Sequence, residues 1–126
     1  MKADPLKMSM YFDFYGDVLT EKQRDFFDLY YNRDLSLGEI AENSGITRQG
    51  VRDVIVRATQ SLESMEEKLS LVARHNAERK GLAEIKEAAA AIEDINSRRF
   101  GNAPIREYAQ RIQYIVADIL NKVHQE

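Results

Sequence analysis

An unbroken apolar stripe in the middle of the chain restricts its fold more than any other feature. Apolar residues recur in alternating steps of four and three, at Val51, Ile55, Ala58, Leu62, Met65, Leu69 and Val72. This spacing is typical of one side of an α-helix, and it predicts a helix of about 22 residues or more, roughly 33 Å long. A stripe of that length requires a partner surface of matching length.

Two later segments contain stripes that can supply this surface. They consist of Leu82, Ile85, Ala89, Ile92 and Ile95 in one segment, and of Ile105, Tyr108, Ile112, Ile115 and Ile119 in the other. Residues 101–104 between them read Gly-Asn-Ala-Pro, which predicts a turn. We expect the three stripes to pack on one another within the chain. The same spacing also fits a coiled-coil-like seam between two copies.

Three shorter helices are predicted before the long one. Residues 8–18 form the first, with aromatic and aliphatic side chains available for packing. A Thr-Glu-Lys-Gln sequence at residues 20–23 has the spacing of a capping box and opens the second, which runs to about Tyr31. Residues 36–39, Ser-Leu-Gly-Glu, repeat that spacing and open the third helix, which Gly45 ends.

Residues 37–56 fit the helix-turn-helix pattern. Ala41 lies where the two helices meet, and Gly45 occupies the turn position that favours a positive φ. The apolar residues expected to hold the helices together are Ile40, Ile46, Val51 and Val54. We therefore predict an all-α, winged-helix-like chain. Residues 1–60 form a helix-turn-helix domain, and its recognition helix continues into residues 61–126, a C-terminal helical packing or oligomerisation region.

The charge balance limits any nucleic-acid binding to a local patch. The chain has 18 Lys and Arg residues against 21 Asp and Glu residues, a net charge of −3. Residues 1–60 carry 8 basic and 10 acidic side chains, and residues 61–126 carry 10 and 11. Neither half is the basic module that phosphate neutralisation favours.

The start of the predicted recognition helix contains the candidate nucleic-acid-binding residues. They are Thr47, Arg48, Gln49, Arg52 and Arg57. Arginine can pair with the major-groove edge of guanine and glutamine with that of adenine, while the threonine and the first helix amides can hold a phosphate. Lys22 and Arg33 can add phosphate contacts, whereas Asp53 and other nearby carboxylates repel the DNA backbone. Because helix-turn-helix units also dock proteins, the pattern leaves a protein-binding role open.

Six segments carry a resemblance to a known family. Residues 11–15, 19–24, 29–31, 36–42, 47–51 and 66–71 read YFDFY, LTEKQR, LYY, SLGEIAE, TRQGV and EEKLSL. Together they resemble the YlxM family of small bacterial proteins over about residues 8–71. Residues 37–62 are also similar in pattern to the promoter-reading region of bacterial sigma factors. Members commonly have Ala at the position of Gly50, where Gly costs about 1 kcal/mol of helix propensity but permits close approach of the backbone.

The resemblance implies an all-helical cytoplasmic protein that binds DNA and regulates transcription. Genes of this family usually lie beside those of the signal recognition particle GTPases, so it also implies a role in that protein-targeting pathway. The alternative is an accessory factor that contacts the signal recognition particle GTPase or its RNA. A homodimer would favour the DNA-binding interpretation, since it would present two recognition helices about one duplex turn apart.

Several other classes of function are disfavoured. The chain has no cysteine, and His75 with Glu78 lacks the further ligands that a metal site needs. No phosphate-binding loop or nucleophile motif occurs, so we expect no enzymatic activity, catalytic residue, cofactor or metal. No apolar run approaches the length of a membrane span. The basic cluster at Arg98 and Arg99 with Phe100 can touch RNA, although we expect Phe100 to close the end of the core.

Overall fold

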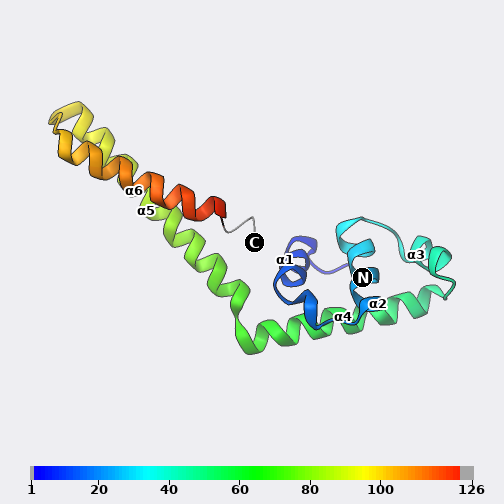
Figure 1. The fold of residues 1–126 in the computed structure, drawn as a ribbon. Coiled ribbons are helices and arrows are strands. Elements are labelled where there is room, and N and C mark those ends of the chain that lie inside the picture. The colour runs from blue at the N-terminus through cyan, green and yellow to red at the C-terminus, as the bar shows by residue number, and fades with distance from the viewer. Residues whose placement is uncertain (1, 123–126) are drawn as a thin grey trace. The chain divides into compact units, whose positions relative to one another are not determined.

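The regular structure of the chain is entirely helical. A computed structural model describes residues 2–122, and Figure 1 shows the helices in chain order. Their bounds are α1 Pro5–Tyr15, α2 Glu21–Phe27, α3 Leu37–Ser44, α4 Arg48–Leu69, α5 Leu71–Arg99 and α6 Ala103–Lys122. A 3-10 turn, η1 (Gly16–Val18), follows α1, and a π-helical turn, η2 (Asp28–Asn32), extends α2. The all-α prediction is confirmed, but no strand occurs in residues 2–122, so the domain lacks the β-hairpin of a winged helix.

The chain divides into two compact units. The first ends at Ala73 and contains α1 to α4, while the second begins at Arg74 and contains most of α5 and all of α6. Residue 60, where we expected the first domain to end, lies inside α4. The recognition helix therefore continues well beyond the helix-turn-helix segment, as the apolar stripe predicts.

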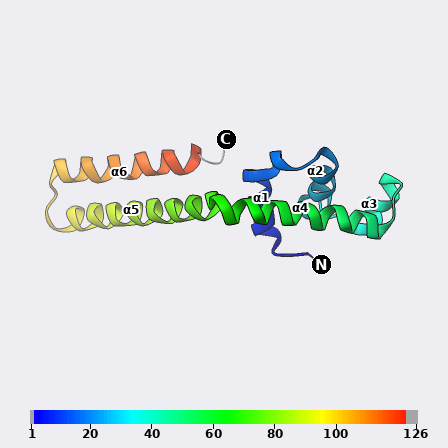
Figure 2. The same ribbon diagram turned by 90° about the horizontal axis from the view of Figure 1, so that it is seen from below.

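The core of the first unit forms along α4. Val51, Ile55, Ala58 and Leu62 are completely buried, at the first four positions of the predicted stripe. Figure 2 shows α1, α2 and α3 distributed along α4, and all three pack against it. Phe27 of α2 is also fully buried, and its ring stacks on that of Phe12 with 5.1 Å between centroids. Burial of these side chains provides most of the driving force for folding of this unit.

The predicted long helix ends where the stripe still continues. α4 has 22 residues and stops at Ser70, which adopts a left-handed conformation with φ 54°. Val72, the last residue of the stripe, lies beyond this break in α5 and is nevertheless buried. The apolar spacing thus extends across a change of helix, because periodicity reports burial rather than continuity of the backbone.

A partly buried hydrogen-bond network joins α1, α4 and α5 at this break. The Tyr15 hydroxyl donates to Glu66 Oε1 over 2.5 Å and accepts from the Leu71 amide over 3.0 Å. The Glu66 carboxylate also accepts from the amides of Val72 and Ala73, each over 3.0 Å. It therefore satisfies amides of the first turn of α5 that would otherwise lack an intrahelical partner.

The network shifts the acidity of both side chains. Burial raises the pKa of Tyr15, and the hydrogen bond to the anionic Glu66 raises it further. Burial opposes ionisation of Glu66, but hydrogen bonds from Tyr15, Val72 and Ala73 outweigh it and hold the pKa of this carboxyl below its usual value of 4.5. Glu66 is therefore a stabilising anion of the folded state.

The second unit is a helical hairpin with a thin interface. The residues buried in it are Ala89, Asn96, Ala109 and Val116. The Asn96 side chain donates to the Asn102 carbonyl over 2.8 Å and accepts from its amide over 3.0 Å, which holds the turn between α5 and α6. Farther along, Arg79 donates to the Leu120 carbonyl over 3.0 Å. The isoleucines of the two predicted stripes stay substantially exposed.

We expect Glu66→Gln to lower the free energy of unfolding by about 1–2 kcal/mol at neutral pH, because the anionic acceptor of three hydrogen bonds is lost. A carboxyl with a lowered folded pKa stabilises above its unfolded pKa, and this stabilisation disappears as pH falls through the folded pKa. The wild type and the variant should therefore converge as the pH falls below the usual carboxyl value of 4.5, in urea unfolding followed by circular dichroism. Glu67→Gln, an exposed neighbour, is the control, and a difference that stays constant as the pH falls would contradict the assignment.

Candidate nucleic-acid interface

Helices α3 and α4 form the predicted helix-turn-helix. Both bonds of the Ser36–Glu39 capping box are present at the start of α3, at 3.1 and 3.2 Å. Gly45 ends α3 in a left-handed conformation with φ 75°, which residues with a Cβ atom rarely adopt. Ile40 and Val51 are buried between the helices, and Ile46 and Val54 pack against the same core. The sequence therefore predicted both the turn and its apolar contacts.

Thr47 begins the recognition helix as its N-cap. Its hydroxyl accepts from the Gly50 amide over 3.0 Å. A Cβ atom at Gly50 would lie 3.2 Å from this hydroxyl oxygen, so glycine here leaves room for the cap. Thr47 thus positions the first turn of α4, where helix amides and the helix dipole favour an anion such as phosphate.

The Arg48 side chain does not extend straight outward from α4 but lies against α3. Its guanidinium lies over Gly38 in the first turn of α3, where a Cβ atom would be 3.1 Å from Nε and 3.3 Å from Nη2. Glycine at position 38 therefore makes room for this arginine. The arrangement keeps the positive charge at the junction of the two helices, and no local sequence signal indicates it.

The centre of the outward side of α4 is polar and partly acidic. Gln49 and Asp53 lie one turn apart on the side opposite the buried stripe, and Gln49 Nε2 donates to Asp53 Oδ1 over 2.9 Å. This bond uses one of the two N–H donors of the Gln49 amide and leaves the other N–H and the carbonyl oxygen available. It also places a carboxylate among the candidate DNA-binding residues, which the sequence predicted as an opposing charge.

Arg52 and Arg57 flank this acidic centre. Both side chains are exposed, and helical spacing places them on opposite margins of the outward side of α4. Arg57 lines a groove of about 560 Å³ together with Gln23 and Gln60. It therefore lies farther from the N-terminus of α4 than the other candidates and faces the start of α2.

The arginines of α4 differ from three other cations of the first unit, which are ion-paired. Arg33 pairs with Asp28 over 3.1 Å, Arg24 with Asp17 over 3.7 Å, and Lys2 with Asp34 over 2.8 Å. In contrast, Arg48, Arg52 and Arg57 form no ion pair within residues 2–122. The three arginines of α4 thus keep their charge available, and Arg33 is less suited to a phosphate contact than expected. Lys7 and Lys22, outside α4, also form no ion pair within residues 2–122. Lys22 lies over the ring of Phe26, 5.8 Å from its centroid.

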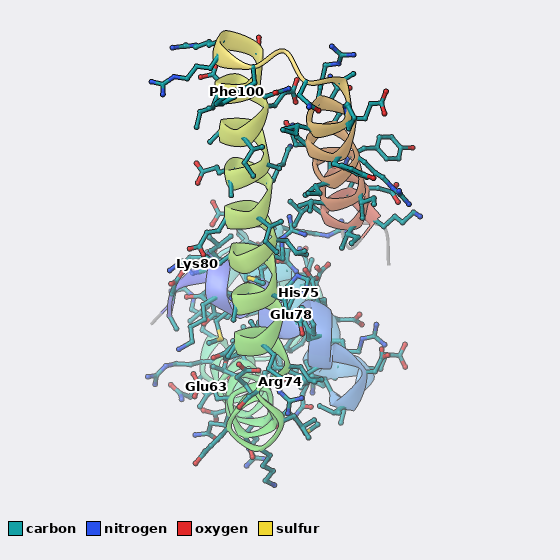
Figure 3. The ribbon with its side chains drawn as sticks, turned by 90° about the vertical axis from the view of Figure 1, so that its left-hand side faces the viewer. Glu63, Arg74, His75, Glu78, Lys80 and Phe100 are labelled. Carbon is teal, nitrogen blue, oxygen red and sulfur yellow. The ribbon has the colours of Figure 1, made fainter. Side chains whose placement is uncertain are left out.

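Other candidate features of the sequence form no additional site. Figure 3 shows His75 and Glu78 on neighbouring turns of α5, and the described residues contain no group of three side chains suited to hold a metal ion. Phe100, at the end of α5, is 71% exposed, so the expectation that it closes the core is wrong. It lies just before the left-handed Gly101, where the turn leaves the helix axis. In residues 2–122 no helix is long and apolar enough to cross a membrane.

Comparison with known proteins identifies relatives of the chain. A family model described as "Putative helix-turn-helix protein, YlxM / p13 like", UPF0122, matches residues 2–99. A UPF0122 protein of Caldanaerobacter subterraneus subsp. tengcongensis is 52% identical over 87 residues, which cover 69% of this chain and 74% of the relative. A UPF0122 protein of Desulforamulus reducens is 42% identical over 116 residues, or 92% of each chain. The similarity thus extends beyond residue 71, where we expected it to end.

We expect Thr47→Ala to lower the free energy of unfolding by about 1 kcal/mol, since the Gly50 amide loses its acceptor. Thr47→Ser keeps the hydroxyl and is the matched control, with a loss well below that of the alanine variant. Urea unfolding monitored by circular dichroism measures both. Equal stability of the alanine and serine variants would show that the cap contributes little to α4.

Proposed function

The chain belongs to the UPF0122 family of YlxM/p13-like helix-turn-helix proteins, and on this basis we propose that it is a non-enzymatic regulator that binds duplex DNA through the start of α4. The observation that carries the proposal is the group of three arginines on α4 that lack an acidic partner, while three other cations of the same unit are ion-paired. Exposed, unpaired arginines on a recognition helix are the groups that release counterions from DNA and reach base edges.

The candidate residues would make different contacts with DNA according to their positions on α4. Thr47 and the first amides of α4 would hold a backbone phosphate and set the register of the helix on the duplex. Arg48, near the junction with α3, and Arg52, one turn along α4, would approach the major groove. Arg57 would contact the backbone beside the groove that it lines. Phosphate contacts position the protein, and only the base contacts would specify a sequence.

Asp53 opposes DNA binding beside Gln49. Gln49 donates one N–H to Asp53 and keeps its second N–H and its carbonyl oxygen for a bidentate contact to adenine. The Asp53 carboxylate would then face a polyanion and repel it. We therefore expect moderate affinity, with a steep dependence on salt.

The alternative proposal is an accessory role in the signal recognition particle pathway. The excess of acidic over basic residues favours a protein partner in this role, because a net charge of −3 gives no general attraction to DNA or RNA. In this case the helix-turn-helix would serve as a scaffold, and the partner would be the targeting GTPase or its RNA. The proposed DNA-binding form is a homodimer, because two copies would present two recognition helices to successive turns of the duplex.

We expect Arg48→Ala with Arg52→Ala to weaken duplex binding at low salt by at least about tenfold, since two charge-bearing contacts are removed. Fluorescence anisotropy with pooled genomic duplex fragments measures the change at low and moderate salt. Arg24→Ala with Arg33→Ala is the matched control, because it removes the same charge from residues that are already ion-paired. Unchanged binding by a folded double variant would remove α4 from the interface.

Parallel titrations with the particle RNA and the purified targeting GTPase separate the two proposals. Salt-sensitive duplex binding that depends on Arg48 and Arg52 supports the DNA-binding role. Binding to the RNA or the GTPase, without duplex binding, would instead support the accessory role.

We expect Asp53→Asn to raise duplex affinity by about threefold, because it removes the carboxylate from the centre of the outward side of α4. The neutral amide keeps nearly the same shape and can still bond to Gln49. Glu63→Gln, about 15 Å farther along α4, is the control for net charge. An equal increase for both variants would show that Asp53 does not face the DNA.

A further inference from the structure

One side of the α5–α6 hairpin carries an extensive exposed apolar face. It consists of Ile85, Ile92 and Ile95 from α5 and Ile105, Tyr108, Ile112, Ile115 and Ile119 from α6. Their exposed fractions range from 39% for Ile105 to 66% for Tyr108. We call this set the isoleucine face. Its members belong to the two stripes that the sequence predicted as packing surfaces.

Helix geometry places all eight side chains on the same side of the hairpin. The residues that join α5 to α6 are buried at Ala89, Asn96, Ala109 and Val116. At 100° per residue, the isoleucine face is rotated from these contacts in the same sense, by about 40° to 110°, on both helices. Figures 1 and 2 show that the helices run antiparallel, so an equal rotation about each axis points to one common side.

The size of the isoleucine face exceeds what a monomer ordinarily leaves in water. The exposed parts of its eight side chains add up to an area on the order of 700 Å², above the largest apolar patch of a typical monomer. Two such faces packed together would bury up to about 1,400 Å², within the range of specific protein interfaces. Contact between two copies of this face would therefore bury enough area for a stable dimer.

The spacing and the charge of the hairpin favour a second copy over a nucleic acid. Along α6 the face recurs in steps of three and four, the pattern by which helices of a bundle interlock. Residues 74–122 carry nine basic and seven acidic side chains, a near balance that gives the unit little general attraction to phosphates. By helical spacing, Glu84 of α5 and Arg111 of α6 lie beyond the outer edge of the face and have opposite charges, which a pair of identical hairpins can match.

We propose that the isoleucine face binds the same face of a second chain, so that two hairpins form a four-helix bundle and the protein is a homodimer. This proposal identifies the surface through which the homodimer of the proposed function would form, and it rests on the proposed function only for that homodimer. Burial of the isoleucines supplies the association energy, and the thin core of each hairpin becomes part of a wider one. DNA is not required for the assembly.

Sedimentation velocity of the full chain, without DNA and at micromolar concentration, tests the proposal. We expect a mass of twice 14.5 kDa for the wild type. Ile92→Gln with Ile112→Gln should raise the dimer dissociation constant by at least about tenfold while circular dichroism stays helical. Tyr114→Gln, at a residue that is 74% exposed on the outer side of α6, is the matched control and should remain dimeric.

Cross-linking tests the same interface without the double variant, and so remains informative if that variant unfolds. The chain has no cysteine, so Ile112→Cys introduces a single thiol in the isoleucine face, and Tyr114→Cys introduces one outside it. We expect a short bismaleimide to join two copies of the first variant and not of the second. A monomeric wild type, or equal cross-linking of the two variants, would overturn the proposal. DNA binding by a monomeric wild type would show that the proposed function survives this failure.

Discussion

Burial of one side of α4 is the constraint on which the first unit depends. Val51, Ile55, Ala58 and Leu62 bring α1, α2 and α3 to a common surface, and the opposite side of the same helix stays exposed. A helix of 22 residues with only one apolar stripe is not stable alone, because nucleation and chain entropy outweigh its hydrogen bonds. The packing that stabilises α4 therefore also determines which of its residues are exposed.

The exposed side of α4 shows two opposing electrostatic effects. Arg48 and Arg52 provide positive charge near the N-terminus of the helix, where its dipole already favours anions. Asp53 provides a carboxylate between these groups and Arg57, and it holds Gln49 by a hydrogen bond. Such a surface binds a polyanion less strongly than a uniformly basic one and depends more on the position of each charge.

The two units stabilise their apolar surfaces differently. The first surrounds α4 with three helices and aromatic rings, whereas the second joins two helices mainly through small residues and the Asn96 bonds. The joint between α4 and α5 relies on Glu66, whose lowered pKa reflects the hydrogen bonds it accepts. An isolated two-helix hairpin has no interior in which long side chains can be fully buried, so its isoleucines stay substantially exposed.

Local sequence signals determined the helices and their order. These signals act over one to a few helical turns, so they can be recognised in the sequence alone. They are the capping boxes at Thr20 and Ser36, the left-handed Gly45 and the apolar stripe of α4. The identity of the DNA-reading candidates also followed from this spacing and stays a prediction. Only the tertiary structure revealed that Arg48 lies over Gly38 and that Tyr15 bonds to Glu66, since these contacts join separate helices. Periodicity shows that a side chain belongs to an apolar stripe, but its burial depends on what packs against that stripe, which three-dimensional packing alone decides.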